Sequence, residues 1–201
     1  MKLFIATKNA NKLKEIEAIL QCPGLSLVSM RDQPELPDVI EDGDSFEANA
    51  RLKAEQIAAE TGLWTLGDDS GLEVDALGGA PGIFSARYSG EPVNHDRNIE
   101  KLLGELVGRE DREARFRCVL ALAQPGGACQ TVEGVCEGVV AEAPRGDRGF
   151  GYDPVFLPAG RRETFGEMDP IQKNRISHRA AALNQAKTSW GGLFSSESSA
   201  W

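Results

Sequence analysis

Two adjacent carboxylates, Asp68 and Asp69, are the residues of this chain best suited to hold a metal ion. They follow residues 63–66, an apolar run that predicts a buried strand. In open α/β sheets the carboxyl ends of the strands border the ligand crevice. Mg²⁺ is commonly held by one or two carboxylates together with water and substrate phosphates, so the pair indicates a magnesium site. The alternative is a turn whose aspartates cap backbone N–H groups.

A polar loop of small residues joins a predicted strand at residues 3–6 to a predicted amphipathic helix. A helix N-terminus attracts phosphate through its free N–H groups and its dipole, and the lysines of this loop would add positive charge. The loop lacks the glycines of a Walker A or dinucleotide motif, and many α/β loops carry Asn and Lys. The residues of this loop are Thr7, Lys8, Asn9, Ala10, Asn11 and Lys12.

Residues 149–154 combine glycines, two aromatic rings and a carboxylate. Glycines let the backbone approach a ligand closely, and an aromatic ring can stack on a base. The alternative is a strand-entry loop whose rings pack in the core. The central residues of this loop are Phe150, Gly151, Tyr152 and Asp153.

Lys173, His178 and Arg179 surround Ser177, which is a good helix cap. Cationic side chains and free N–H donors would point the same way there, which favours an anionic ligand. A lone histidine is more often structural, although a histidine beside an arginine at a cap is less ordinary.

The elements that must position these residues alternate between strand and helix, which predicts an α/β fold. Helices are expected at residues 45–60, where Asp44 and Glu47 resemble a capping box, at 94–107, and after Ser177. Two strands are expected to form an antiparallel hairpin around Gly126, and residues 67–71 are expected to break the strand that precedes them. The other expected strands are residues 25–28, 72–76, 114–122, 131–140 and 155–157. We expect one mixed-sheet domain with two lobes over residues 1–201, with a frayed Ser-rich end from about residue 195.

The composition is that of an ordinary globular protein, with 41% apolar and 26% charged residues in 201. The net charge of −9 argues against a broad basic face for nucleic acid or anionic lipid. The four cysteines form no C-x-x-C pair and are expected to be reduced thiols. Neither a secretory signal nor an apolar run of membrane length is present in the sequence, so the expected compartment is the cytoplasm.

Several spaced blocks of the sequence occur together in one known family. They are residues 6–9 with Lys12, 45–50, 68–72, 79–82 with 85–88, 149–154 and 176–179. In this order they strongly resemble the inosine/xanthosine triphosphate pyrophosphatases, often called the HAM1 or RdgB-like family, over nearly the whole chain. The resemblance implies an elongated mixed β-sheet with flanking helices, forming two lobes around a central nucleotide-binding cleft, and a homodimer.

The resemblance also implies roles for individual residues. Asp69 matches the general base and metal ligand, Glu41 is similar to a second magnesium ligand, and Asp68 is a further candidate ligand. Ser70 resembles a substrate contact. Residues 7–12 look like the triphosphate-binding loop, and residues 150–153 like the loop next to the base. Lys173, His178 and Arg179 match residues that hold the nucleotide.

The expected activity is Mg²⁺-dependent hydrolysis of ITP, dITP and XTP to monophosphate and pyrophosphate, which prevents incorporation of these nucleotides into DNA and RNA. One alternative is a pyrophosphatase for pyrimidine or methylated nucleotides, since the phosphate and metal chemistry would be the same. Another is a non-catalytic nucleotide-binding module, favoured only if the aspartates are mere caps.

Overall fold

The structure is a computed structural model that describes residues 1–194. The tail from residue 195, expected to be frayed, lies outside the described residues. The chain divides into two compact units. Of the described residues, unit 1 comprises Met1–Asp69, Cys118–Gly134 and 179–194, and unit 2 comprises Ser70–Arg117 and Val135–His178. Each unit is built from several separate stretches of sequence. The boundary between the units is therefore not marked by a single linker that could be recognised in the sequence.

Six strands form one sheet in the order β2-β1-β3-β4-β5-β6. Strand β1 pairs in parallel with β2 and β3, whereas β5 pairs antiparallel with β6. The predicted mixed α/β sheet is therefore confirmed. The strands are β1 (Lys2–Ile5), β2 (Ser26–Ser29), β3 (Trp64–Val74), β4 (Glu113–Ala123), β5 (Cys129–Val140) and β6 (Phe156–Pro158).

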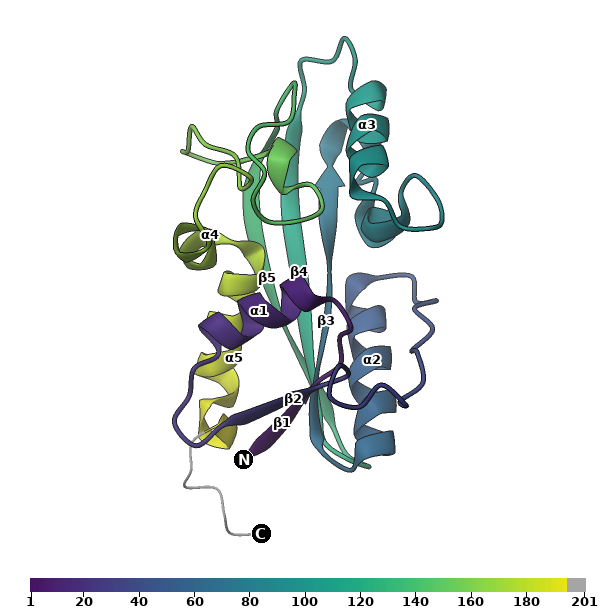
Figure 1. Cartoon of the computed structure of the whole chain (residues 1–201), viewed down its shortest axis with the longest axis vertical. Helices are drawn as coiled ribbons and strands as arrows, with labels where there is room; N and C mark the ends of the chain where they lie inside the picture. The colour runs from purple at the N-terminus through teal and green to yellow at the C-terminus, as the bar shows by residue number, and fades with distance from the viewer. Residues whose placement is uncertain (195–201) are drawn as a thin grey trace. The chain divides into compact units, whose positions relative to one another are not determined.

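Unit 1 has a helix layer on each face of its part of the sheet (Figure 1). Along β1, Leu3 and Ile5 belong to one core cluster, which α1 (Ala10–Ile19) and α5 (His178–Phe194) cover. The alternate residue Phe4 belongs to a second cluster with Ile57 of α2 (Phe46–Thr61). Because successive strand side chains point to opposite faces, α2 lies on the face opposite α1 and α5.

Unit 2 has its own apolar core. It gathers one face of α3 (His95–Glu105) with strand residues and three phenylalanines, Phe116, Phe156 and Phe165. The rings of Phe116 and Phe156 pack edge to face, 4.7 Å apart at their centroids. The shorter elements of this unit are the 3₁₀ turns Asp75–Leu77, Gly82–Arg87 and Asp153–Val155, and helix α4 (Pro170–Ile176).

Two local predictions were wrong, and one helix was missed. The expected break at residues 67–71 is absent, since β3 continues to Val74 with β4 as its neighbour on the side away from β1. Helix α2 is capped by Ser45 rather than Asp44, because Ser45 is extended and its hydroxyl accepts the N–H of Ala48 at 3.2 Å. Helix α4 was not predicted, although Asp169 caps it and Pro170 occupies its first position.

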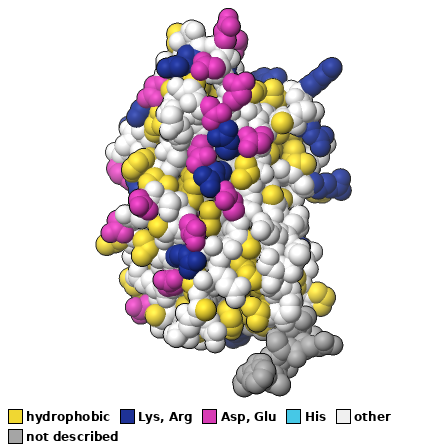
Figure 2. All heavy atoms as spheres, turned by 180° about the vertical axis from the view of Figure 1, so that it is seen from behind, with side chains coloured by type: hydrophobic (Ala, Val, Ile, Leu, Met, Phe, Trp, Pro, Cys, Tyr) yellow, Lys and Arg dark blue, Asp and Glu magenta, His cyan; other side chains and the backbone are white. Residues whose placement is uncertain are grey.

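Lys and Arg side chains lie among Asp and Glu on the face of the molecule that Figure 2 shows. Within unit 2, Arg115 pairs with Asp75 and Glu137. On this face, side chains of both charges are interspersed. None of the helices in the described part of the chain has both the length and the hydropathy needed to cross a membrane. The four cysteines are free thiols, as expected.

Candidate functional site

Asp68 and Asp69 lie within β3, at the point where its parallel neighbour β1 has ended. Ile5, the last residue of β1, pairs with Leu66, so the two aspartates extend just past that edge. Because adjacent residues of a strand point to opposite faces, the two carboxylates have different partners. Asp68 meets cations of α1 and α5, whereas Asp69 meets α2. Because Asp68 and Asp69 are neighbours in a strand, their side chains lie on opposite faces and do not form the shared metal site that the sequence indicated.

Asp68 is buried and pairs with two cations. Lys12 Nζ lies 2.7 Å from its Oδ1, and Arg179 Nε donates to its Oδ2 at 2.7 Å. The guanidinium of Arg179 also pairs with Glu15, which neutralises its remaining side. Burial by itself would raise the pKa of Asp68, but Arg179 and Lys12 outweigh it and hold that pKa well below its ordinary value. Asp68 is therefore an ionised anchor that fixes the Lys12 ammonium.

Asp69 shares a buried lysine with Glu41. Lys53 Nζ lies 2.8 Å from Asp69 Oδ1 and 3.0 Å from Glu41 Oε2. Burial raises the pKa of Asp69 despite the nearby Lys53 ammonium. For Glu41, burial also acts to raise the pKa, but Lys53 outweighs it and the pKa falls. A carboxylate whose pKa is raised toward neutral is better matched to taking up a proton.

The second oxygen of Asp69 has an unusual environment. Oδ2 is buried and has no hydrogen-bond partner in the structure. A buried carboxylate oxygen left in this way is costly, and a hard cation would satisfy it. Within residues 1–194 no group of three or more His, Cys, Asp or Glu side chains converges on one point. The donor set of Asp69 and Glu41 therefore fits Mg²⁺, whose other ligands are water and substrate phosphates, and does not fit a metal caged by protein alone.

The predicted phosphate loop is folded mainly on itself. The side chain of Asn9 caps α1 by accepting the amides of Asn11 and Lys12 at 2.9 and 3.2 Å. Thr7 Oγ1 accepts the amide of Asn9 at 3.2 Å. Several of the N–H groups expected to be free are thus occupied. Lys12 is the cation of this loop that lies next to the aspartates, whereas Lys8 pairs with exposed Asp38.

The glycine-rich loop of unit 2 closes on its own carboxylate. Asp153 Oδ2 accepts the amide of Phe150 at 2.8 Å and pairs with Lys173 Nζ at 2.6 Å. Gly149 adopts φ of 76°, and a Cβ there would lie 2.0 Å from Asp153 Oδ2. This position therefore requires glycine, both for its backbone conformation and for the approach of the carboxylate.

The two rings of this loop have different surroundings. Phe150 is half-buried, and Lys173 Nζ lies 4.9 Å from its ring centroid. Tyr152 is only 3% exposed and belongs to the core of unit 2. For Tyr152 the core-packing alternative describes the ring correctly, whereas Phe150 is only half-buried.

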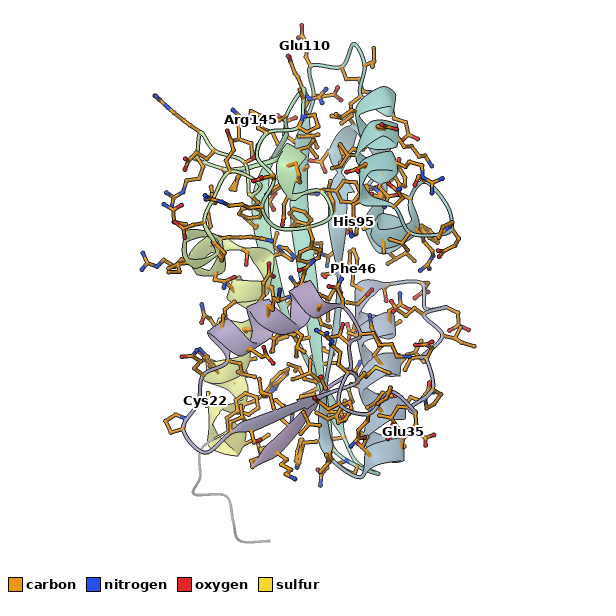
Figure 3. The ribbon with its side chains drawn as sticks, in the orientation of Figure 1. Cys22, Glu35, Phe46, His95, Glu110 and Arg145 are labelled. Atoms are coloured by element: carbon orange, nitrogen blue, oxygen red, sulfur yellow. The ribbon has the colours of Figure 1, made fainter. Side chains whose placement is uncertain are left out.

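The two histidines also differ. His95, labelled in Figure 3, is exposed at the start of α3. His178 is buried, and its ring stacks on Phe116 with centroids 4.6 Å apart and planes 13° apart. Stacking on an aromatic ring fixes the orientation of the imidazole.

The structure thus brings the predicted site residues together as two clusters, one in each unit. The first, the carboxylate cluster, contains Glu41, Asp68, Asp69, Lys12 and Arg179, with residues 7–11 at the start of α1. The second, the aromatic-loop cluster, contains Phe150, Gly151, Tyr152, Asp153, Lys173 and His178. Ser70 follows Asp69 in β3 and is half-buried.

Sequence reasoning missed Lys53 and Glu15. The burial of Lys53 could have been predicted from the sequence, because Lys53 lies on the same helical face as Ala50, Ala54 and Ile57. These three residues are fully buried. A lysine in an apolar stripe needs a buried anion. Glu15 carried no such signal, because it lies on a helix with many charged residues.

Comparisons with known proteins agree with one another. The sequence profile described as the Ham1 family matches residues 3–189. A protein of Bacillus licheniformis named dITP/XTP pyrophosphatase is 50% identical over 186 residues, which cover 92% of this chain and 95% of that protein. A protein of Bacillus subtilis with the same name is 47% identical over 184 residues, 90% of this chain and 93% of that protein. The solved structure of a HAM1 protein from Coxiella burnetii superposes with a TM-score of 0.88 at 39% identity, covering 96% of this chain and 99% of that one.

Proposed function

Because the chain belongs to the Ham1 family, we propose that it is a nucleoside-triphosphate pyrophosphatase acting on noncanonical purine nucleotides. Its substrates would be ITP, dITP and XTP, cleaved to the monophosphate and pyrophosphate and so kept out of DNA and RNA. The names of the relatives that match nearly the full chain support this substrate class. The observation that carries the proposal is the buried carboxylate of Asp69, whose Oδ1 pairs with the Lys53 ammonium and whose Oδ2 has no hydrogen-bond partner.

The reaction requires water to attack the α-phosphorus while pyrophosphate leaves, so catalysis depends on positioning and on charge stabilisation. In this proposal Asp69 orients the water and takes up its proton at the carboxylate. Lys53 keeps Asp69 and Glu41 in place. Lys12, fixed by Asp68, binds the phosphate chain together with residues 7–11.

Asp69 and Glu41 would hold the Mg²⁺ ion. When bound, such an ion supplies Lewis-acid charge to phosphate oxygens and lowers the pKa of a bound water. The fit rests on the chemistry of the two carboxylates and on the unpartnered Asp69 oxygen. Asp68 is a weaker candidate ligand, because Lys12 and Arg179 already neutralise it.

The aromatic-loop cluster is assigned to the base. Phe150 would stack on the purine, and Gly151 lets the backbone come close to it. Lys173 and His178 would hold the nucleotide, as would Ser70. Arg179, expected from the sequence to do the same, is fully buried and paired with Asp68 and Glu15, so its role would be to fix Asp68. The pairing of Lys173 with Asp153 supports this assignment, since it fixes the loop before any ligand arrives.

The test is pyrophosphate release from ITP, XTP, dITP, ATP and GTP at neutral and alkaline pH, with Mg²⁺ and with chelator. We expect Mg²⁺-dependent release from ITP, dITP and XTP, with little from ATP or GTP. Release from none of them by a folded protein would favour the non-catalytic binding module. Release from pyrimidine triphosphates alone would change the substrate class and keep the chemistry.

The proposal includes a homodimer, which the family resemblance implies, and the cytoplasmic location expected from the sequence. Light scattering coupled to size exclusion measures the mass of the particle directly. A mass of one chain across a concentration series would contradict the dimer.

A further inference from the structure

The phenol of Tyr152 ties the aromatic loop to a distant segment of unit 2. Its OH donates to the backbone carbonyl of Ser85 at 3.0 Å, across 67 residues of sequence. The ring is buried, and the acceptor lies in the 3₁₀ turn Gly82–Arg87. A buried phenol normally has such a partner, and here the partner belongs to a different loop.

The accepting carbonyl is itself held firmly. The Ser85 hydroxyl accepts the amide of Leu72 at 2.9 Å and donates to the carbonyl of Gly82 at 2.6 Å. The Ser85 carbonyl also accepts a hydrogen bond from Asn98 Nδ2 at 3.3 Å. Strand β3, the 3₁₀ turn and helix α3 therefore converge on one residue.

Asn98 strengthens this anchor from α3. Its amide also donates to the carbonyl of Ala86 at 2.9 Å, and its Oδ1 accepts the amide of Ser89 at 2.7 Å. The side chain is 1% exposed. All the polar atoms of the Asn98 amide are thus used to hold the 82–89 segment, so the Ser85 carbonyl is a fixed point for the loop that reaches it.

Tyr152 lies in the loop between Phe150, which is assigned to the base, and Asp153, which pairs with Lys173. The amide of Asp153 donates to the carbonyl of Phe150 at 3.2 Å, and the amide of Val155 donates to the carbonyl of Tyr152 at 3.0 Å. Through this tight turn, any movement of Tyr152 would be passed to Phe150 and Asp153. Burial keeps the phenol protonated, because it raises the pKa of Tyr152, and the donor therefore persists at alkaline pH.

We propose that Tyr152 is a positioning residue, which holds Phe150 and Asp153 in place for the base by donating its hydrogen bond to the Ser85 carbonyl. This role differs from the nucleotide contact expected for Tyr152 from the sequence, and it rests on the proposed function of the loop. Removing the phenolic OH should therefore weaken recognition of the nucleotide without slowing the chemical step.

The experiment compares Tyr152→Phe with Tyr88→Phe. Tyr88 is the other tyrosine of the chain, and its OH bonds to Glu105 on α3 rather than to the loop. For Tyr152→Phe we expect KM for ITP to rise about three- to tenfold, the size of one neutral hydrogen bond, with kcat within about twofold of wild type. Selectivity for ITP over ATP should fall. Tyr88→Phe should leave KM and selectivity at the wild-type values.

A second measurement needs no activity. Hydrogen exchange of the unliganded protein reports the amide of Phe150, which bonds to Asp153. We expect faster exchange at residues 149–155 in Tyr152→Phe and unchanged exchange there in Tyr88→Phe. If wild type cleaves none of the triphosphates, the proposed function fails, whereas the exchange result still decides whether Tyr152 holds the loop.

Three results would overturn the inference. One is unchanged exchange and unchanged KM in Tyr152→Phe. Another is a loss in kcat with KM unchanged, which would make Tyr152 a catalytic contact. The third is failure of Tyr152→Phe to fold, which would assign the bond to global stability.

Discussion

The ammonium of Lys53 lies 2.8 Å from Oδ1 of Asp69, on the buried side of α2. The other oxygen of Asp69 has no hydrogen-bond partner, so this carboxylate is held at one atom and left open at the other. A group held in this way is oriented for chemistry before its ligand arrives, which lowers the cost of organising the site.

Replacing Asp69 by Asn should abolish turnover and keep the fold. Asparagine has nearly the same shape but neither takes up a proton nor carries the charge that attracts a cation. General base catalysis is worth on the order of 10² to 10⁴ in rate, so at least that loss is expected. Pyrophosphate release from ITP and the melting temperature are measured together. Full activity in a folded Asp69→Asn protein would exclude Asp69 as the base.

Replacing Lys53 by Met should destabilise the protein strongly in the absence of Mg²⁺. It leaves Asp69 and Glu41 without their shared cation, and breaking a buried ion pair costs about 3–5 kcal/mol, an upper bound here because Glu41 is partly exposed. Since a divalent cation would satisfy the same carboxylates, Mg²⁺ should raise the melting temperature of this variant more than that of wild type.

Lys14→Met provides the control for that experiment, because Lys14 is an exposed lysine on α1. Its free energy of unfolding should stay within about 0.5 kcal/mol of wild type, with the same response to Mg²⁺. An equal Mg²⁺ response in Lys53→Met and wild type would argue against a metal at Glu41 and Asp69.

Asp68 should make the free energy of unfolding depend on pH in the acidic range. Its pKa is held well below the ordinary value of 3.8, because Arg179 and Lys12 outweigh the effect of burial. A carboxylate whose folded pKa is depressed contributes stability above its unfolded pKa, and that contribution is lost as the pH falls toward the folded pKa. The free energy of unfolding should therefore start to fall below about pH 4.

Asp68→Asn isolates this contribution. At pH 7 it should be less stable than wild type by about 3 kcal/mol, as for other buried pairs that lose one partner. The difference should shrink as the pH falls from the unfolded pKa of about 4 toward the depressed folded pKa of Asp68. Urea denaturation at several pH values from 7 to 3 measures it. A difference that is constant over this range would show that the charge of Asp68 is not its source.

The pair of Lys173 and Asp153 should behave as a unit. Both side chains are buried, with 5% and 3% of their surface exposed. Lys173→Met alone leaves a buried charge and should cost about 3–5 kcal/mol, whereas adding Asp153→Asn removes that charge and should recover part of the loss. Chemical denaturation of both single variants and the double variant gives the coupling. Strictly additive losses would mean that the two groups do not interact.

Much of the fold could be predicted because its elements are set by local pattern. The apolar stripe of residues 94–107 predicts α3, which Asn94 caps by accepting the amide of Arg97. The alternation on either side of Gly126 predicts β4 and β5, with a positive φ of 64° at that glycine. The expected break at residues 67–71 failed because pairing with a long neighbour overrides weak local strand propensity.

By itself, the sequence determined which residue types are present at each strand end and loop: the aspartate pair, the lysines of residues 8–12, and the glycines and carboxylate of residues 149–153. Only the tertiary structure decided their partners. It joined Asp69 to Lys53 across 16 residues and Asp68 to Arg179 across 111. Periodicity reports only whether a side chain faces the core or the solvent. Which charges meet inside that core depends on how the helices pack on each face of the sheet, and the chain specifies that packing only as a whole.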